Sequence, residues 1–164
     1  MSKTVNTTIS LGKPITAPCL IPVLHASTPN CISNPFMVDG KAYRITALSF
    51  GTPHGTIVVN DVESVDISSL GSALGTHPRF PKGASIVFIE IIDNETVKAR
   101  LWQYDVGEID FTNDAIGVAA VVAMMLQKIM KHKATVLMGG NTFTVEWDRI
   151  GDVSLTDSTD LVQA

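Results

Sequence analysis

The sequence is poor in charge and lacks any apolar run long enough to cross a membrane. Asp, Glu, Lys and Arg make up 17% of its 164 residues, below the share of about 25% that is usual in soluble domains. The 12 basic side chains do not cluster along the chain, so nothing predicts a nucleic-acid-binding face. The longest uncharged apolar run, residues 115–126, is shorter than the roughly 20 residues of a membrane helix. We therefore expect neither nucleic acid nor a membrane as a partner.

Cysteine is scarce as well, and this limits both the compartment and the chemistry. Cys19 and Cys31 are isolated, too few for a disulfide scaffold. The first six residues have no apolar core of a secretory signal, so we expect a cytoplasmic protein with reduced thiols. The four histidines lack metal-ligand spacing, and no nucleotide-binding or Gly-x-Ser-x-Gly motif is present. We expect no metal and no cofactor.

What the sequence does contain is material for one packed domain over residues 1–164. Apolar residues make up 45% of the chain, which suffices for a core at this length. A turn at Asp39-Gly40, one around Asp93-Asn94 and one around Gly139-Gly140 each separate two runs rich in apolar and β-branched residues. This pattern is typical of β-hairpins, so several antiparallel strand pairs are predicted.

One long helix is predicted over residues 114–131. Asn113 suits its N-cap and Asp114 its first turn, while three lysines follow near its end. Apolar residues occur all the way round it, and a helix that is apolar on every face is buried on every face. Together with the hairpins, this predicts an α+β fold in which a mixed or antiparallel sheet curls around one buried central helix.

The segment before this helix carries a family resemblance. Residues 101–115 read Leu-Trp-Gln-Tyr-Asp-Val-Gly-Glu-Ile-Asp-Phe-Thr-Asn-Asp-Ala. They resemble the frame Trp/Tyr-Glu-Arg-Gly-x-Gly-Glu-Thr-x-Ala-Cys-Gly-Thr/Ser-Gly of the diaminopimelate epimerases, cofactor-independent amino-acid epimerases. Residues 48–54 resemble the family's Val-Ser-Met-Gly-Asn-Pro-His, and residues 75–83 its His-x-x-Phe-Pro-x-Gly segment. These motifs follow one another in the order of the family's second, C-terminal lobe.

The resemblance implies a lobe rather than a whole family enzyme. In the family, two similar lobes each wrap a sheet on a central helix, and the active site lies between them. This sequence begins where the second lobe begins, and it stops at residues 161–162, where the family chain would cross back. We expect a single C-terminal lobe, without the first lobe and its catalytic cysteine.

Thr112 occupies the position of the family's second catalytic cysteine. The family reaction moves a proton on and off the substrate's α-carbon with two thiols, whose pKa a helix N-terminus can lower. A threonine hydroxyl does not ionise near neutral pH and is a poor base for such a carbon. A structural or vestigial role is therefore expected for Thr112. A catalytic role stays open, because some proline-racemase-like relatives have a threonine there.

The family binds the substrate's α-carboxylate at the N-terminus of the central helix, where free N–H groups favour an anion. Asn113 and Asp114 stand there in this sequence, and the Asp114 carboxylate would repel the ligand's carboxylate. An ordinary helix start explains both residues equally well. Either way, the resemblance implies a weakened carboxylate site.

Four more family contacts to the substrate have changed. Thr52 and Ser85 replace two asparagines, and Gln103 and Tyr104 replace the Glu-Arg pair that holds the substrate's amino and carboxylate groups. Recognition of a zwitterion by ion pairing is then lost.

Two candidate site residues of the family are kept in this sequence. His54 either serves the site or is an ordinary turn histidine. Glu108 either serves the site or braces the loop before the helix.

These observations lead to three hypotheses of function. The leading one is a catalytically degenerate lobe that acts through association, as a homodimer or with a partner lobe. The alternative is one subunit of a split amino-acid epimerase of the diaminopimelate type, in lysine biosynthesis, completed by a second chain. The third is a domain whose remodelled cleft binds a neutral or cationic small molecule.

Overall fold

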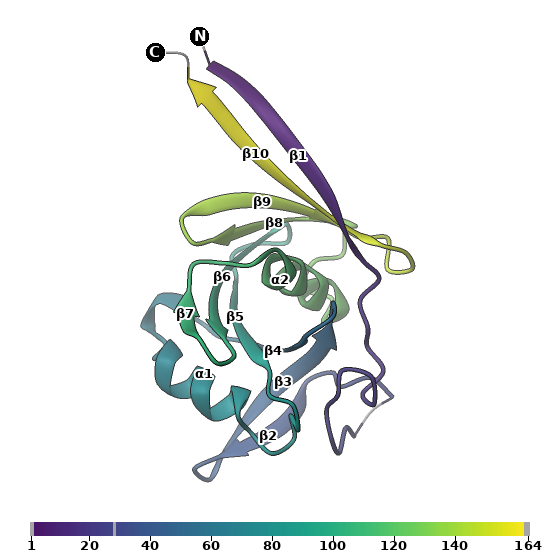
Figure 1. Cartoon of the computed structure of the whole chain (residues 1–164), viewed down its shortest axis with the longest axis vertical. Helices are drawn as coiled ribbons and strands as arrows, with labels where there is room; N and C mark the ends of the chain where they lie inside the picture. Colours follow the sequence, from purple (N-terminus) through teal and green to yellow (C-terminus); the bar gives the residue numbers. More distant parts are fainter. Residues whose placement is uncertain (1, 28, 163–164) are drawn as a thin grey trace.

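The computed structural model describes residues 2–27 and 29–162, which build one open mixed sheet with helices on both faces (Figure 1). The strand order is β1-β10-β9-β8-β6-β5-β4-β3-β2, with β7 paired to β6. Neighbours are antiparallel except for β4–β5 and β6–β8. The strands are β1 (Ser2–Gly12), β2 (Asn34–Val38), β3 (Lys41–Ser49), β4 (Pro53–Val58), β5 (Ser85–Ile91), β6 (Thr96–Gln103), β7 (Gly107–Ile109), β8 (Lys133–Met138), β9 (Asn141–Glu146) and β10 (Val153–Val162). The helices are η1 (Val62–Ser64), α1 (Ile67–Gly75) and α2 (Asn113–Met125).

Helix α2 is the centre of the larger core. Every residue from 115 to 124 is buried, and the helix contacts β1, β3, β4, β5, β6, β8, β9 and β10. Figure 1 shows it between the β8–β9 hairpin and β4. The predicted α+β fold with one buried central helix is confirmed. The sheet is open, with β1 and β2 as its edges.

Both ends of α2 differ from the prediction. The N-cap is Thr112 rather than Asn113. The helix ends at Met125 instead of residue 131, because Gln127 adopts a left-handed conformation with φ of 59°. The N–H groups of Gln127 and Lys128 then donate back to the carbonyls of Met124 and Ala123, at 3.0 and 2.9 Å. Such bonds satisfy the last carbonyls and terminate a helix.

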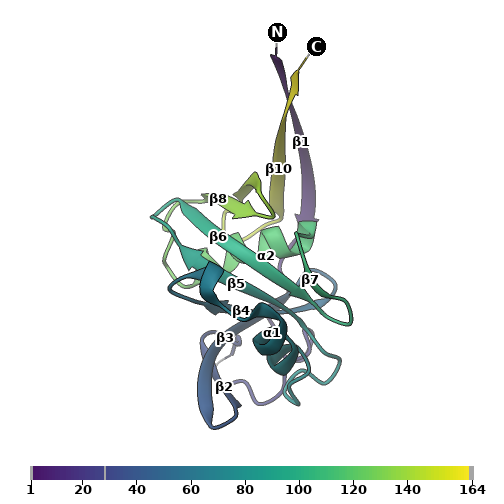
Figure 2. The same ribbon diagram turned by 90° about the vertical axis from the view of Figure 1, so that its left-hand side faces the viewer.

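Helix α1 covers the other face of the sheet, over a second core cluster that includes Trp102 (Figure 2). It packs so closely on this indole ring that its glycines are needed for space. A Cβ atom built on Gly71 or Gly75 would lie 2.5 or 2.3 Å from Trp102 atoms. The side chain of Asp66 caps the helix by accepting from the N–H of Ser69 at 3.2 Å.

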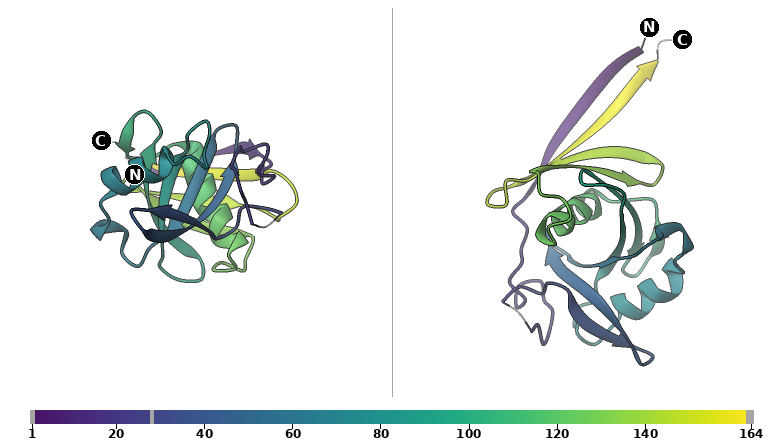
Figure 3. Two further views of the ribbon diagram at one scale, coloured as in Figure 1. Left: turned by 90° about the horizontal axis from the view of Figure 1, so that it is seen from below. Right: turned by 180° about the vertical axis from the view of Figure 1, so that it is seen from behind.

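The first and last strands form a two-stranded ribbon that extends away from the rest of the chain (Figures 1 and 3). β1 pairs with β10 from Ser2↔Val162 to Gly12↔Val153, whereas β10 pairs with β9 only over residues 154–157. Beyond residue 157, β10 is therefore paired with β1 alone. Among the described helices, none is both long and apolar enough to cross a membrane.

Candidate functional site

The N-terminus of α2 holds the residue that stands in place of the family's catalytic cysteine. Thr112 is the N-cap, in an extended conformation with φ of −131°. Its Oγ1 atom accepts a hydrogen bond from the N–H of Ala115 at 3.0 Å. Asn113 is exposed, and Asp114 is half-buried in the first turn. The Thr112 side chain therefore satisfies one of the free N–H groups at this end of the helix.

His54 lies beside this helix end, on β4. The ring is only 3% exposed, and its Nδ1 atom lies 2.9 Å from the carbonyl oxygen of Thr52 in the preceding turn. Burial lowers the pKa of His54 below its usual value, against the opposing effects of the Thr52 carbonyl and the Asp114 carboxylate. The ring is therefore neutral at pH 7. Because a carbonyl only accepts, Nδ1 carries the proton and donates to Thr52.

Ser85 and Tyr104 continue the site from the next two strands. Ser85 is the register partner of His54 across the parallel β4–β5 pair. Its Oγ atom accepts a hydrogen bond from the backbone N–H of Tyr104 at 3.0 Å. The Tyr104 ring is 43% exposed and lies against Gly83, where an added Cβ would come within 2.1 Å of it. Gln103 ends β6 directly before it, half-buried.

The structure thus brings together most of the site residues expected from sequence. Direct contacts link Thr52 to His54 and Ser85 to Tyr104, the β4–β5 register joins these two pairs, and Asp114 acts electrostatically on the His54 ring. These groups supply hydroxyls, a neutral imidazole and a carboxylate, but no thiol and no cation. Such a set can hydrogen-bond a polar ligand, and it offers nothing to pair with a carboxylate.

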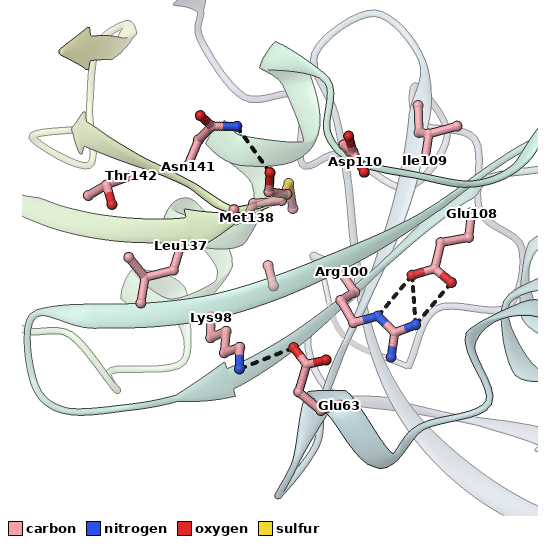
Figure 4. Close-up of a pocket in the computed structure, with 13 residues that line it drawn as sticks. Glu63, Lys98, Arg100, Glu108, Ile109, Asp110, Leu137, Met138, Asn141 and Thr142 are labelled. Atoms are coloured by element: carbon pink, nitrogen blue, oxygen red, sulfur yellow. Dashed lines mark hydrogen bonds and ion pairs between the residues drawn. The ribbon is translucent and has the colours of Figure 1, made fainter. Parts of the chain in front are cut away.

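Glu108 is expected in the site, but its side chain is directed to Arg100 on β6. Its carboxylate forms a two-pronged ion pair with Arg100, with Nε–Oε2 and Nη2–Oε1 distances of 2.8 and 2.9 Å (Figure 4). Both side chains line a cavity of about 670 Å³, which Lys98 and Glu63 also line, paired at 3.1 Å. No residue of the α2 N-terminus lines this cavity. The contact fits the alternative in which Glu108 braces the segment before the helix, here by holding β7 on β6.

Sequence reasoning overlooked Arg100, the partner of Glu108. The signal was the alternation of β6, in which Lys98 and Arg100 are two residues apart and so share one face of the strand. In the part of the chain that the structure describes, no three His, Cys, Asp or Glu side chains are grouped so that they could hold a metal ion.

The fold of this chain is similar to that of epimerases of known structure. A predicted epimerase from Pseudomonas aeruginosa aligns with a TM-score of 0.57 at 14% identity, covering 99% of this chain and 61% of that one. A hydroxyproline epimerase from Agrobacterium vitis, solved with bound trans-4-hydroxy-L-proline, aligns with a TM-score of 0.56 at 11% identity, covering 97% and 51%. At these identities the likeness shows a shared fold.

The sequence comparison is more specific. Residues 46–162 match the pattern of the family described as Diaminopimelate epimerase, and the chain belongs to this family. A diaminopimelate epimerase from Geobacillus sp. (strain WCH70) is 29% identical over 158 residues, which cover 96% of this chain and 56% of that protein. The chain spans about half the length of the curated relatives it matches.

Proposed function

We propose that this chain is a diaminopimelate-epimerase-like lobe that has lost the family reaction and acts through association. One observation carries the proposal. At the position of the family's catalytic thiol, the Thr112 hydroxyl accepts a hydrogen bond from Ala115 and caps the buried helix. A side chain in this role contributes to the stability of the helix start, and its hydroxyl is a poor base near neutral pH.

The electrostatics of the site support the same proposal. Asp114 places a carboxylate in the first turn of α2, where the family binds the carboxylate of its substrate. His54 is buried and neutral, and Gln103 and Tyr104 supply neither a carboxylate nor a cation. A zwitterionic amino acid would thus meet repulsion at one end and no ion pair at the other.

Proton exchange tests the loss of activity. The purified protein is incubated with LL-diaminopimelate in deuterated water, and the α-proton signal is followed by NMR. We expect no exchange above a heat-killed sample, while an intact diaminopimelate epimerase exchanges the proton under the same conditions. Thr112→Cys alone should not restore exchange, because Asp114 and the uncharged pair remain. Exchange by the unaltered protein would overturn the proposal.

Association is the positive part of the proposal. The segment from β6 to α2 carries three exposed apolar side chains, Tyr104, Val106 and Phe111, next to the site residues that a second lobe faces in the family. Exposed apolar groups that gather on one face commonly mark an interface. A second copy is the simplest partner, because one self-complementary surface then closes a two-fold dimer. We place this assembly in the cytoplasm, where free Cys19 and Cys31 stay reduced.

Light scattering at micromolar concentration tests the association. We expect a mass near twice the 17.6 kDa of the chain. Val106→Glu should shift the mass towards that of one chain, since a charge at an apolar interface is costly. Ile92→Glu, at an exposed isoleucine directly after β5, is the control. If the unaltered protein has the mass of a single chain, this face is exposed to solvent and the homodimer proposal is wrong.

The second candidate function is one half of an amino-acid epimerase completed by another polypeptide. The names of the curated relatives support it, since those matched along half their length are diaminopimelate epimerases. The test adds a first lobe of a family enzyme, carrying its cysteine, to the exchange assay. Exchange with the unaltered chain would favour this candidate over a degenerate lobe. Exchange only with Thr112→Cys would show that association persists and chemistry is lost.

A further inference from the structure

A second cavity lies at the other end of the central helix, separate from the site around Thr112. Its volume is about 660 Å³, within the range of small-molecule sites. Strands β3 and β4, the segment just before β2 and the residues after α2 line it. The 13 residues of α2 separate the two ends by about 20 Å. None of the site residues expected from the family resemblance lines this cavity.

The first notable feature is a buried hydroxyl without a partner. Thr56 lines the cavity and is only 2% exposed, yet its Oγ1 atom forms no hydrogen bond with any described residue. It is the one buried side-chain oxygen or nitrogen in the described chain of which this is true. Its cross-strand neighbour Thr46 differs, because that Oγ1 atom accepts from the N–H of Ser33 at 3.0 Å. Buried polar groups in native proteins are almost always satisfied, so Thr56 points to a missing partner.

The second feature is charge of one sign. Lys41, Arg44 and Lys128 line the cavity, and no Asp or Glu does. None of the three forms an ion pair with a described carboxylate. The contacts they do make leave N–H groups free: Arg44 donates through Nη1 to the carbonyl of Ser33 at 3.2 Å, and the Lys41 ammonium lies 5.1 Å from the centre of the Tyr43 ring. In a chain of net charge −4, this is a local excess of positive charge.

The end of α2 does not cancel this charge. A helix C-terminus carries partial negative charge on its free carbonyls. Here the carbonyls of Ala123 and Met124 accept from the N–H groups of Lys128 and Gln127. The field in the cavity is therefore set by the three cationic side chains.

We propose that this cavity binds a small anion that carries phosphate or carboxylate groups. Lys41, Arg44 and Lys128 hold the negative groups, and a polar atom of the ligand completes the hydrogen bonding of Thr56. The guanidinium of Arg44 suits both anions, since its parallel N–H groups match two oxygens of either. The site is independent of the reaction chemistry at the other end of α2.

Titrations followed by NMR test the site, with pyrophosphate and citrate as separate probes. In ¹⁵N-labelled protein, we expect saturable shifts of the amide signals of Thr46, Thr56 and Lys128 with at least one probe. Saturable shifts with pyrophosphate alone would identify a phosphate ligand, and shifts with citrate alone a carboxylate ligand. Shifts with both probes would mean that the site accepts either anion. The absence of saturable shifts with both probes would overturn the proposal.

Two variants show whether the cations are responsible. The double change Lys41→Gln and Arg44→Gln should weaken binding of the effective probe by about tenfold or more, as expected for lost hydrogen bonds to charged groups. Lys133→Gln and Lys82→Gln together remove the same charge at exposed positions outside the cavity and should change the affinity by less than about twofold. Equal weakening by the two pairs would mean general charge attraction and no site.

Thr56→Val separates a ligand role from a structural one. The side chains have nearly the same shape, so removing an unsatisfied buried hydroxyl should leave the melting temperature unchanged or raise it. The same change should weaken binding of the probe. A lower melting temperature with unchanged affinity would show that the hydroxyl serves the protein itself, and the proposal would fail.

Discussion

The hydroxyl of Thr112 accepts a hydrogen bond from the backbone N–H of Ala115, with 3.0 Å between Oγ1 and N. This contact joins the residue at the family's thiol position to the first turn of a helix that is buried from Ala115 to Met124. Such a cap stabilises a helix start, because the first N–H groups of a helix have no partner within the helix. Thr112 thus has a structural role that can be measured.

Thr112→Ala should lower the free energy of unfolding by about 1 kcal/mol, the usual cost of losing an N-cap side chain. Urea unfolding followed by fluorescence gives this value. Thr112→Ser keeps the accepting oxygen and is the matched control, expected to lose much less. Equal stability of the alanine and threonine forms would contradict the capping role.

The buried ring of His54 predicts a pH dependence of stability. Burial lowers the pKa of His54 in the folded protein, so the unfolded chain takes up the proton first as the pH falls. The contribution of the neutral His54 ring to the free energy of unfolding is fully present above the unfolded pKa of about 6.5. It is lost below that value, as the pH falls towards the lower folded pKa. We expect the free energy of unfolding to fall between pH 7 and pH 5.

His54→Asn should flatten that part of the pH profile, although it also lowers stability at pH 7 by leaving a cavity. The slope, rather than the absolute stability, is therefore the quantity to compare. His25→Asn is the matched control, since His25 is exposed and its left-handed backbone suits asparagine. The same flattening in both variants would rule out a special contribution from His54.

The hairpins could be predicted from the sequence because their turns need particular residues. Asp39 and Gly40 have φ of 49° and 79°, and Gly139 and Gly140 have 60° and 77°, the left-handed values of a two-residue turn that matches strand twist. Gln127 is a residue without such a preference, so nothing in the sequence placed the end of α2 there. Local preference fixes a turn, while tertiary contacts decide where this helix stops.

The candidate site, too, could be predicted from the sequence only in part. The family motifs nominate Thr52, His54, Ser85 and Tyr104, and the pairing of β4 with β5 brings these residues into one region. They could not place Glu108, whose position depends on the β6–β7 register that brings it to Arg100. Pairing between charged side chains of different strands is set by register, and a single sequence does not contain that information.

Gly71→Ala tests the close contact between α1 and the sheet. Alanine favours a helix over glycine by about 1 kcal/mol, but the new Cβ would lie 2.5 Å from Trp102 Cβ. Overpacking of this kind costs about 1–3 kcal/mol, so we expect a net loss of stability in urea unfolding. Ser72→Ala, at an exposed position of the same helix, should be neutral or slightly stabilising. A more stable Gly71→Ala protein would show that α1 moves away without cost.

Arg79 ties the segment before β2 to the loop after α1. Its guanidinium donates to the carbonyls of Leu24, His25 and Pro35, the first two at 2.9 and 3.0 Å. It also lies 4.1 Å from the centre of the Phe36 ring, close enough for a cation–π contact. A single planar group therefore fixes two points of the irregular segment before β2 and one point within β2.

Arg79→Lys keeps the charge but cannot reproduce this fork of donors. With net values of about 1.5–3 kcal/mol for a hydrogen bond to a charged group, the loss of one or two bonds should lower the free energy of unfolding by about 2–3 kcal/mol in urea. Faster hydrogen exchange at the N–H of Leu24, which donates to the Arg79 carbonyl at 2.8 Å, should accompany it. Arg149→Lys is the matched control, because Arg149 makes one such bond, to Ile129 at 2.9 Å. If both variants lose the same stability, the three-point clamp contributes no more than one ordinary hydrogen bond.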